Sequence, residues 1–420
     1  MFRIAIPTYD RCDNFKTIKF LEDNNIPLDI IDIFVANENE REKYIFKIGT
    51  KYNFIVGELG IMNQRNFITD YYPENQIIVS MDDDIENLTH KSGKLFMEWL
   101  PECIDYINNN DIGLLGISPS SNKFFFDQNT SDVSFKQGNY LCVGVFHIFK
   151  NIKSIKLNID FVEDYQKSLE YIKIFGKNAR YMDIFLKTKY WNKKGGLSSQ
   201  RNKDTYNNMI YKFIYNYSKY ISFNYKIIKE LDKYNELPNL KIKQNYDVSP
   251  SKIIQLPKIP AQEFSELYCM LENITIPKKH KSTNRRGFPL GHQATTFGYT
   301  RGRFNGKYDV SAMSKKYPEI YNEILRIGNI YCPLKYESIH VNRNVVTPPH
   351  KDSRNVGQSM LVSFGDYTGC KIVIDNETYD AELQPIIFDG ANYEHWNTND
   401  LIGTKYSLVF FCGEMSNSLI

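Results

Sequence analysis

Short hydrophobic runs alternate with more polar segments over the first 84 residues of the chain. The runs are rich in Ile, Val and Phe, and they predict buried strands. They cover residues 3–8, 31–37, 52–58 and 76–84. The segments between them are predicted as helices, at residues 17–25, 38–49 and 61–72. Strands that alternate with helices at this spacing predict β-α-β units and a mostly parallel sheet covered on both faces.

Three consecutive acids, Asp82, Asp83 and Asp84, end the fourth predicted strand. Sheets of this kind bind ligands beyond the carboxyl ends of their strands. Carboxylate oxygens are hard ligands that suit Mn²⁺ or Mg²⁺, and a cation held here would bridge a diphosphate. The alternative interpretation is helix capping followed by a solvated turn, which a lone D-x-D would favour.

The surroundings of these acids carry a family resemblance. The opening IPTYDR, the predicted helix 61–72 with its Arg65, and the segment FVEDYQKSLEYIKIFG at 161–176 together resemble a GT-A glycosyltransferase. The resemblance extends over about residues 1–200 and includes the glycine pair at 195–196. It implies a Rossmann-like mixed sheet with flanking helices and a nucleotide-sugar donor, with UDP-glucose the expected one.

The same resemblance assigns roles to individual residues. Asp82 and Asp84 would hold Mn²⁺ or Mg²⁺ and the nucleotide-sugar, so that the metal neutralises the leaving diphosphate. Asp164 or Glu163 would take the proton from the acceptor hydroxyl as it attacks. Arg65 would pair with the phosphate or the base of the donor; an ordinary surface arginine is the equally weighted alternative.

The middle of the chain is less informative. Residues 198–226 interleave Tyr with Lys and Arg, which suits a nucleic-acid strand, but their helical spacing favours an amphipathic helix that includes Ile210 and Phe213. Residues 236–260 are polar and rich in proline, which predicts a linker between a domain at 1–235 and a second domain at 261–420. That second domain opens with a predicted helix at 263–274. The basic run KKHKSTNRR follows at residues 278–286; it is either a phosphate contact or a solvated face.

Two histidines and one acid in the last part of the chain form a metal-ligand pattern. His350 and Asp352 are spaced as H-x-D, and His395 follows much later. Alternate residues of a strand share a face, so the H-x-D pair would point the same way, and His395 would come from a distant strand. Two imidazoles and one carboxylate with open positions form the facial triad of non-haem Fe(II) oxygenases.

A lysine strengthens this interpretation. Lys405 begins the predicted strand KYSLVFF, and Ser407 shares its face. H-x-D…H followed by a cation and Ser resembles a 2-oxoglutarate/Fe(II) dioxygenase, in which the cation is usually Arg. The resemblance implies a double-stranded β-helix of the jelly-roll or cupin type, Fe(II), 2-oxoglutarate and O₂. Lys405 and Ser407 would bind the distal carboxylate of 2-oxoglutarate, although lysine offers a point charge where arginine offers a fork.

A finer resemblance covers about residues 285–413. The block NRNVVTPPHKDSRNVGQSMLVSFGDYTG, with the later FDG, H and GTKYSLVFF, looks like the TET and J-binding-protein branch of these dioxygenases. It departs from that branch at Lys405 and at Cys370, where a second glycine would be expected. The branch oxidises the 5-methyl group of pyrimidines in DNA. Arg343, Asn344 and Arg354 would then hold the flipped base or its phosphates; scaffold hydrogen bonds are the alternative.

Fused in one chain, the two resemblances imply a fold class of α/β plus mainly β and a two-step function. An oxygenase would install a hydroxyl on thymine in DNA, and a glycosyltransferase would cap that hydroxyl with a sugar, as in base J. The first alternative is a protein-modifying enzyme, because collagen lysyl hydroxylases also join these two domains. The second is a DNA- or sugar-binding module whose sites are relics.

Composition adds little to this picture. A net charge of +3 neither requires nor opposes nucleic acid, and 42% hydrophobic and 24% charged residues are ordinary for a globular protein. The seven cysteines are odd in number, dispersed and free of C-x-x-C, which predicts free thiols in a reducing compartment. Without a signal-like start or a membrane-length apolar run, the expectation is an intracellular protein of the host or of a virus factory, and not a secreted one.

Overall fold

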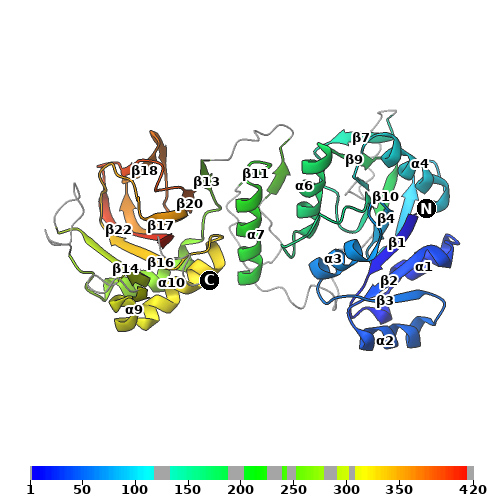
Figure 1. Cartoon of the computed structure of the whole chain (residues 1–420), viewed down its shortest axis with the longest axis horizontal. Coiled ribbons are helices and arrows are strands. Elements are labelled where there is room, and N and C mark those ends of the chain that lie inside the picture. The colour runs from blue at the N-terminus through cyan, green and yellow to red at the C-terminus, as the bar shows by residue number, and fades with distance from the viewer. Residues whose placement is uncertain are drawn as a thin grey trace. The chain divides into compact units, whose positions relative to one another are not determined.

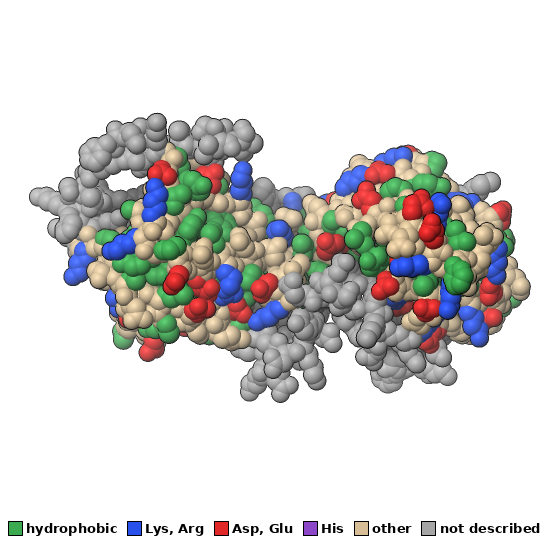
Figure 2. Space-filling model, turned by 90° about the horizontal axis from the view of Figure 1, so that it is seen from below, with side chains coloured by type: hydrophobic (Ala, Val, Ile, Leu, Met, Phe, Trp, Pro, Cys, Tyr) green, Lys and Arg blue, Asp and Glu red, His purple; other side chains and the backbone are tan. Residues whose placement is uncertain are grey.

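The computed structural model describes residues 2–117, 133–187, 203–224, 239–243, 252–278, 291–301 and 308–413. The chain divides into two compact units (Figure 1). The first comprises residues 1–209, 220–223 and 240–246, and the second comprises residues 210–219, 224–239 and 247–420. Each unit has its own sheets and its own buried core. On the face drawn in Figure 2, both basic and acidic side chains are present on each unit.

The first unit is built on an eight-stranded sheet. Its strands lie in the order β3 (Asn53–Val56), β2 (Ile31–Val35), β1 (Phe2–Pro7), β4 (Ile77–Met81), β8 (Phe146–Lys150), β6 (Leu114–Ile117), β9 (Asn178–Tyr181) and β7 (Phe135–Gly138). The four strands expected from the sequence are all present and mutually parallel. The sheet becomes mixed at β8, which runs antiparallel to both of its neighbours.

Helices cover both faces of this sheet, as the β-α-β pattern predicted (Figure 1). On one face, α1 (Lys16–Asp23), α2 (Glu38–Ile48) and α4 (Phe96–Asn109) contribute to a core around Trp99. On the other face, α3 (Ile61–Tyr71) and α6 (Glu163–Phe175) pack against alternate residues of the same strands, such as Phe34 and Ile78. The buried strands are therefore apolar on both sides, which is why they appear as continuous hydrophobic runs.

Two short strand pairs and one longer helix complete this part of the chain. β5 (Asn87–His90) pairs with β10 (Ile184–Lys187), and β11 (Ile221–Asn224) pairs with β12 (Asn239–Ile242). Helix α7 (Lys203–Tyr217) confirms the helix expected within 198–226, because its apolar residues are buried. The Tyr211 hydroxyl donates to the Pro257 carbonyl at 2.9 Å. The buried tyrosines of this helix therefore serve packing rather than stacking on nucleic-acid bases.

The second unit contains two antiparallel sheets. The larger has the order β13 (Ile253–Gln255), β20 (Ile386–Phe388), β17 (Asn355–Thr368), β22 (Ile402–Gly413), β16 (Ser338–Arg343), β14 (Gln293–Arg301) and β15 (Tyr308–Val310). The smaller has the order β19 (Glu377–Tyr379), β18 (Ile372–Ile374) and β21 (His395–Asn397). A cluster that includes Leu361, Ile374 and Phe388 packs between the two sheets.

Helices cover the opposite face of the larger sheet. These are α8 (Ser265–Glu272), α9 (Ala312–Lys316) and α10 (Pro318–Tyr331). Tyr268 packs edge-on against Tyr406, and Phe297 stacks on Tyr321. Side chains of β22 thus alternate between a face that carries Tyr406 under the helices and a face that carries Lys405 toward the smaller sheet.

Several details differ from the sequence expectations or lie outside them. Residues 253–255, expected in the linker, form β13 and pair with β20. The basic run 278–286, apart from Lys278, and the glycine pair 195–196 lie outside the described residues. All seven cysteines are free thiols. None of the described helices is long and apolar enough to cross a membrane.

Candidate active sites

His395 and His350 are brought together by the backbone. The two residues form an isolated antiparallel bridge, with reciprocal N–H···O bonds of 3.1 and 3.0 Å. His395 also pairs with Ile374, which is fully buried between the sheets, so both imidazoles share the inner face. His350 is a single bridge residue rather than part of a regular strand, which corrects the expected strand for H-x-D.

Asp352 completes the group from a turn. Its backbone N–H donates to the Gly390 carbonyl at 2.7 Å, which ties the turn to the segment before β21. Asp352 Oδ1 lies 3.9 Å from His350 Nε2, and Oδ2 lies 3.5 Å from His395 Nε2. One donor atom from each residue falls within 4.8 Å of the other two. Among the described residues, this is the one such group of three.

The hydrogen bonds of the two imidazoles determine which nitrogen is available. His350 Nδ1 lies 2.7 Å from the Pro348 carbonyl oxygen, and His395 Nδ1 lies 3.0 Å from the Tyr393 carbonyl oxygen. A carbonyl only accepts, so each Nδ1 carries the proton and donates it. Each Nε2 is then unprotonated, and its lone pair is available for a metal ion. Backbone carbonyls orient metal-binding histidines in this way, and the donor set fits Fe(II).

Gly390 leaves room beside these donors. A Cβ placed on it would lie 3.4 Å from His395 Cε1 and 3.5 Å from Asp352 Oδ2. Any larger side chain would grow from that point toward the three donors. The glycine that follows Asp389 therefore keeps one side of the group clear.

Lys405 is buried inside the second unit. Its residue exposure is 6%, and its Nζ donates to the Cys370 carbonyl at 2.7 Å and to Cys370 Sγ at 3.2 Å. The ring of Tyr367 lies 5.4 Å away. Among the described residues, no carboxylate pairs with this ammonium. A buried cation without an anionic partner is unfavourable, so this position suits an anionic ligand.

Ser407 lies on the same inner face as Lys405. Its cross-strand partners are Asn342 and Ser363, and Asn342 Nδ2 donates to Ser407 Oγ at 3.2 Å. His340, two residues before Asn342, shares this face and contacts Thr296 Oγ1 through Nδ1 at 2.9 Å. Asn342 and His340 were not among the site residues expected from the sequence, although the alternation of residues along this strand indicates both.

The three residues expected to hold substrate have different surroundings. Arg343 pairs with Tyr406 on the outer face and forms an ion pair with Glu272 at 3.0 Å, so the structure does not bring it to the histidines. Asn344 adopts a left-handed conformation, and its side chain accepts from the Lys405 N–H at 2.7 Å. Both therefore make the scaffold contacts that were the alternative. Arg354 is exposed, two residues after Asp352.

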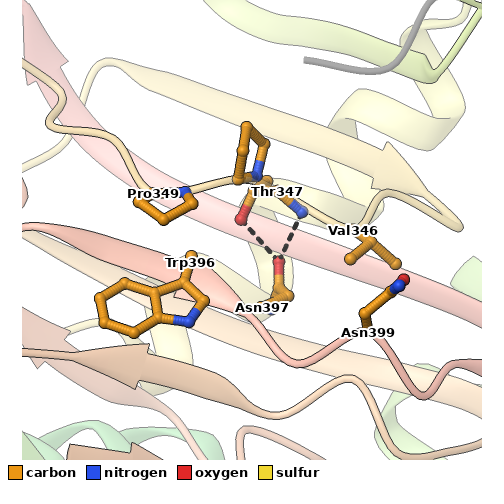
Figure 3. A pocket seen from close by; sticks show the side chains of 7 residues that line it. Val346, Thr347, Pro349, Trp396, Asn397 and Asn399 are labelled. Atoms are coloured by element: carbon orange, nitrogen blue, oxygen red, sulfur yellow. Dashed lines mark hydrogen bonds between the residues drawn. The ribbon is translucent and has the colours of Figure 1, made fainter. Parts of the chain in front are cut away.

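A small hollow is lined by residues that neighbour the two histidines in the chain (Figure 3). Its volume is about 230 Å³, and Pro349 and Trp396 contribute to its lining. Because these two residues directly neighbour His350 and His395 in the chain, they belong to the opposite face of the strand pair. Thr347 donates to Asn397 Oδ1 at the other side of the hollow. The hollow is thus separate from the group of metal donors.

In the first unit, Arg65 lies at the centre of the acidic strand end. It is only 5% exposed, which excludes the alternative of an ordinary surface arginine. Its guanidinium lies 3.4 Å from Asp82 Oδ1 and 3.4 Å from Glu163 Oε1, and it donates to the Gly144 carbonyl at 3.3 Å. Helix α3 therefore joins the end of β4 to the start of α6.

The other two acids pair with a second arginine. Arg11 donates to Asp83 Oδ1 and to Asp84 Oδ2, both at 2.9 Å, and Thr8 donates to Asp83 at 2.7 Å. The three acids thus share two arginines. A cation at Asp82 and Asp84 would need further ligands, and the oxygens of a diphosphate are suitable ones.

Asp164 faces this cluster from the first turn of α6. Its Oδ2 accepts from the Gly144 N–H at 3.3 Å. Burial, followed by the neighbouring Glu163 carboxylate, raises the pKa of Asp164 to about 7. Burial, opposed by Arg65, raises the pKa of Asp82 to about 8, although this side chain is still 29% exposed. A carboxylate with a pKa near neutrality is suited to general base catalysis.

These raised pKa values predict how the stability of the first unit depends on pH. In the folded chain Asp82 and Asp164 keep protons that the unfolded chain releases above about pH 4. These two groups should therefore lower the free energy of unfolding as pH rises from about 5 to about 8, whereas His147 and Lys167, whose pKa values are lowered by burial, contribute in the opposite direction. This free energy is measured by denaturant unfolding of a chain in which Trp191 and Trp396 are replaced by Phe. The fluorescence of Trp99 then reports on the first unit alone.

Asp82→Asn serves as the control for this prediction. The amide does not titrate, so the free energy of unfolding of the parent relative to this variant should decrease between about pH 5 and 8. A difference between parent and variant that stays constant or increases over this range would contradict the proposed buried proton of Asp82.

Comparisons with known proteins are limited. No family model matches the chain, and no curated protein matches it. The solved structure of NgTET1 in complex with 5mC DNA is 17% identical, with coverage of 40% of this chain and 74% of NgTET1 and a TM-score of 0.30. An oxidoreductase of the 2OG-Fe(II) oxygenase family from Burkholderia pseudomallei is 13% identical, with coverage of 38% and 84% and a TM-score of 0.28.

A glycosyltransferase is also among the similar solved structures. The mannosyltransferase PcManGT from Pyrobaculum calidifontis, in complex with GDP-Man and Mn²⁺, is 12% identical, with coverage of 50% of this chain and 61% of its own and a TM-score of 0.34. TM-scores this low carry no argument about fold or activity.

Proposed function

We propose that the second unit is an Fe(II)- and 2-oxoglutarate-dependent dioxygenase and that the first unit is a glycosyltransferase. The single observation that carries the proposal is the arrangement of two Nε2 atoms and one carboxylate, with both Nδ1 protons committed to backbone carbonyls. Iron bound by this group, with 2-oxoglutarate and O₂, supplies the oxidation that places a hydroxyl on an unactivated carbon.

Each residue of the site in the second unit has its own proposed role. His350 and His395 offer neutral nitrogen ligands, and Asp352 offsets part of the metal charge. Lys405 binds the distal carboxylate of 2-oxoglutarate, and Ser407 adds a hydroxyl on the same face. Gly390 keeps the space beside the ligands open for substrate.

In the first unit, Asp164 accepts the proton of the attacking hydroxyl. Asp82 and Asp84 hold Mn²⁺ or Mg²⁺ against the diphosphate of a nucleotide-sugar, with UDP-glucose the first donor to test. Arg65 holds Asp82 and Glu163 in place, and its role toward the donor is to pair with the phosphate or the base. Support for these roles comes from the convergence of β4, α3 and α6 on one cluster.

The proposed substrate is thymine in DNA, first hydroxylated on its methyl group and then glycosylated. This choice is supported by the sequence resemblance to the TET and J-binding-protein branch over about residues 285–413. A base in a duplex has to leave the stack to reach a buried metal. Exposed Arg354, close to Asp352 in the chain, is the side chain best placed to meet a phosphate.

Nucleoside mass spectrometry of DNA from cells that express the full chain tests the substrate. We expect a thymidine derivative that has gained one oxygen, and a second derivative that carries a hexose on that oxygen. Lysine-containing peptides are assayed beside thymidine oligonucleotides with Fe(II) and 2-oxoglutarate. Hydroxylation of the peptides alone would replace DNA with protein as the substrate and would favour the lysyl hydroxylase alternative.

Lys405→Met tests the co-substrate. A hydrogen bond to a charged group contributes about 1.5–3 kcal/mol, so the KM for 2-oxoglutarate should rise about ten- to a hundredfold. The variant should be at least as stable as the parent, because it removes a buried charge without a carboxylate partner among the described residues. Lys335→Met, at an exposed lysine of the same unit, is the matched control. An unchanged KM in Lys405→Met would reject Lys405 as the anchor.

A further inference from the structure

The ammonium of Lys405 lies against a residue that has no role in the proposal above. Its Nζ donates to both the carbonyl oxygen and the thiol of Cys370, at 2.7 and 3.2 Å. Cys370 is 2% exposed and lies between β17 and β18. Both partners are buried, so water does not readily replace either contact.

The turn that carries Cys370 is fixed in place. Cys370 has φ 51° and Gly369 has φ 74°, both in the left-handed region. The Cys370 N–H donates to Asp400 Oδ1 at 2.7 Å, and Thr398 donates to the same carboxylate oxygen at 2.6 Å. These two hydrogen bonds, led by that of Thr398, lower the pKa of Asp400. The turn therefore presents the carbonyl and the thiol of Cys370 to Lys405 in one defined orientation.

The backbone of Lys405 is also held by hydrogen bonds. Asn344 donates its backbone N–H to the Lys405 carbonyl at 2.8 Å and accepts the Lys405 N–H through its side chain at 2.7 Å. The cross-strand partner is Gly365, where a Cβ would lie 2.2 Å from the Thr404 carbonyl oxygen. The backbone of Lys405 is thus fixed on both sides, and only its flexible stem needs orientation.

We propose that Cys370 is a positioning residue that directs the Lys405 ammonium toward the distal carboxylate of 2-oxoglutarate. An ammonium has three N–H donors; Cys370 takes two, and one remains for a ligand oxygen. Lysine is a point charge on a flexible stem, whereas arginine carries a rigid fork. Cys370 supplies the fixed orientation that the lysine itself lacks. This inference rests on the proposed role of Lys405.

Two substitutions at Cys370 isolate the thiol. Cys370→Gly removes Sγ and keeps the backbone carbonyl, and glycine adopts the left-handed conformation readily, so the fold should persist. Cys370→Ser restores an acceptor at nearly the same place. The full chain is loaded with Mn²⁺ instead of iron without O₂, and the Kd of 2-oxoglutarate is measured by calorimetry.

We expect Cys370→Gly to raise the Kd of 2-oxoglutarate two- to tenfold, the effect of one lost hydrogen bond. Cys370→Ser should stay within about twofold of the parent. The Kd of 2-oxobutyrate, which has no distal carboxylate, should not change in either variant. An equal loss for both ligands, or no loss for either, would overturn the positioning role.

Lys405→Met in the same titration separates the two proposals. If it leaves the Kd of 2-oxoglutarate unchanged, the proposed anchor is wrong and the role of Cys370 is wrong with it. If it weakens binding while Cys370→Gly does not, the anchor stands and only the positioning role is rejected.

Discussion

His350→Ala is expected to abolish hydroxylation and to lower the affinity for Fe(II) at least about a hundredfold. Loss of a residue that only orients a metal ligand already lowers metal affinity about ten- to a hundredfold, and His350→Ala removes a ligand itself. The remaining pair, His395 and Asp352, leaves the metal with one nitrogen and one carboxylate. Metal content after dialysis and succinate formation from 2-oxoglutarate measure the two effects.

The matched control for this prediction is His292→Ala, in the second unit but outside the group of metal donors. It should retain both metal and turnover. Because the sugar can be added only after the hydroxyl exists, DNA from cells with His350→Ala should contain neither product. Full turnover in His350→Ala would remove the basis for the iron site.

Asp164→Asn is expected to lower glycosyl transfer by about 10²–10⁴, the usual contribution of a general base. The amide keeps the shape of the side chain but cannot accept the proton of the acceptor hydroxyl. Hydroxylation should continue, so the hydroxylated base should accumulate without the hexose. Nucleoside mass spectrometry of the same DNA reports both products at once.

The pH dependence of transfer adds a second test of Asp164. A pKa of about 7 means that the basic form increases as pH rises through neutrality, so the rate of transfer should rise between about pH 6 and 8. If Asp164→Asn transfers sugar normally, the base lies elsewhere, and Glu163→Gln becomes the next variant to examine.

The strands of the first unit could be predicted from the sequence for a physical reason. Its strands are buried on both faces, so each appears as a short, continuous apolar run, and all four expected strands are present. The H-x-D…H spacing likewise indicated residues that the backbone brings together, since His350 and His395 form a bridge. Local pattern and tertiary structure agree at these positions.

Other features could not be predicted from a local sequence pattern, because they depend on contacts between segments that are distant in the chain. Strand β13 has only three residues among prolines, and its partner β20 lies far away in the chain. Arg343 was expected near the substrate, but strand alternation directs it to Glu272 on the outer face. The contact between Lys405 and Cys370 depends on a left-handed turn that is fixed by Asp400.

The most direct test is anomalous scattering from crystals of the full chain grown with Fe(II) or Mn²⁺. We expect one ion in the second unit, at about 2.0–2.3 Å from His350 Nε2, His395 Nε2 and one carboxylate oxygen of Asp352. An ion bound elsewhere in that unit, or one that contacts either histidine through Nδ1, would contradict it.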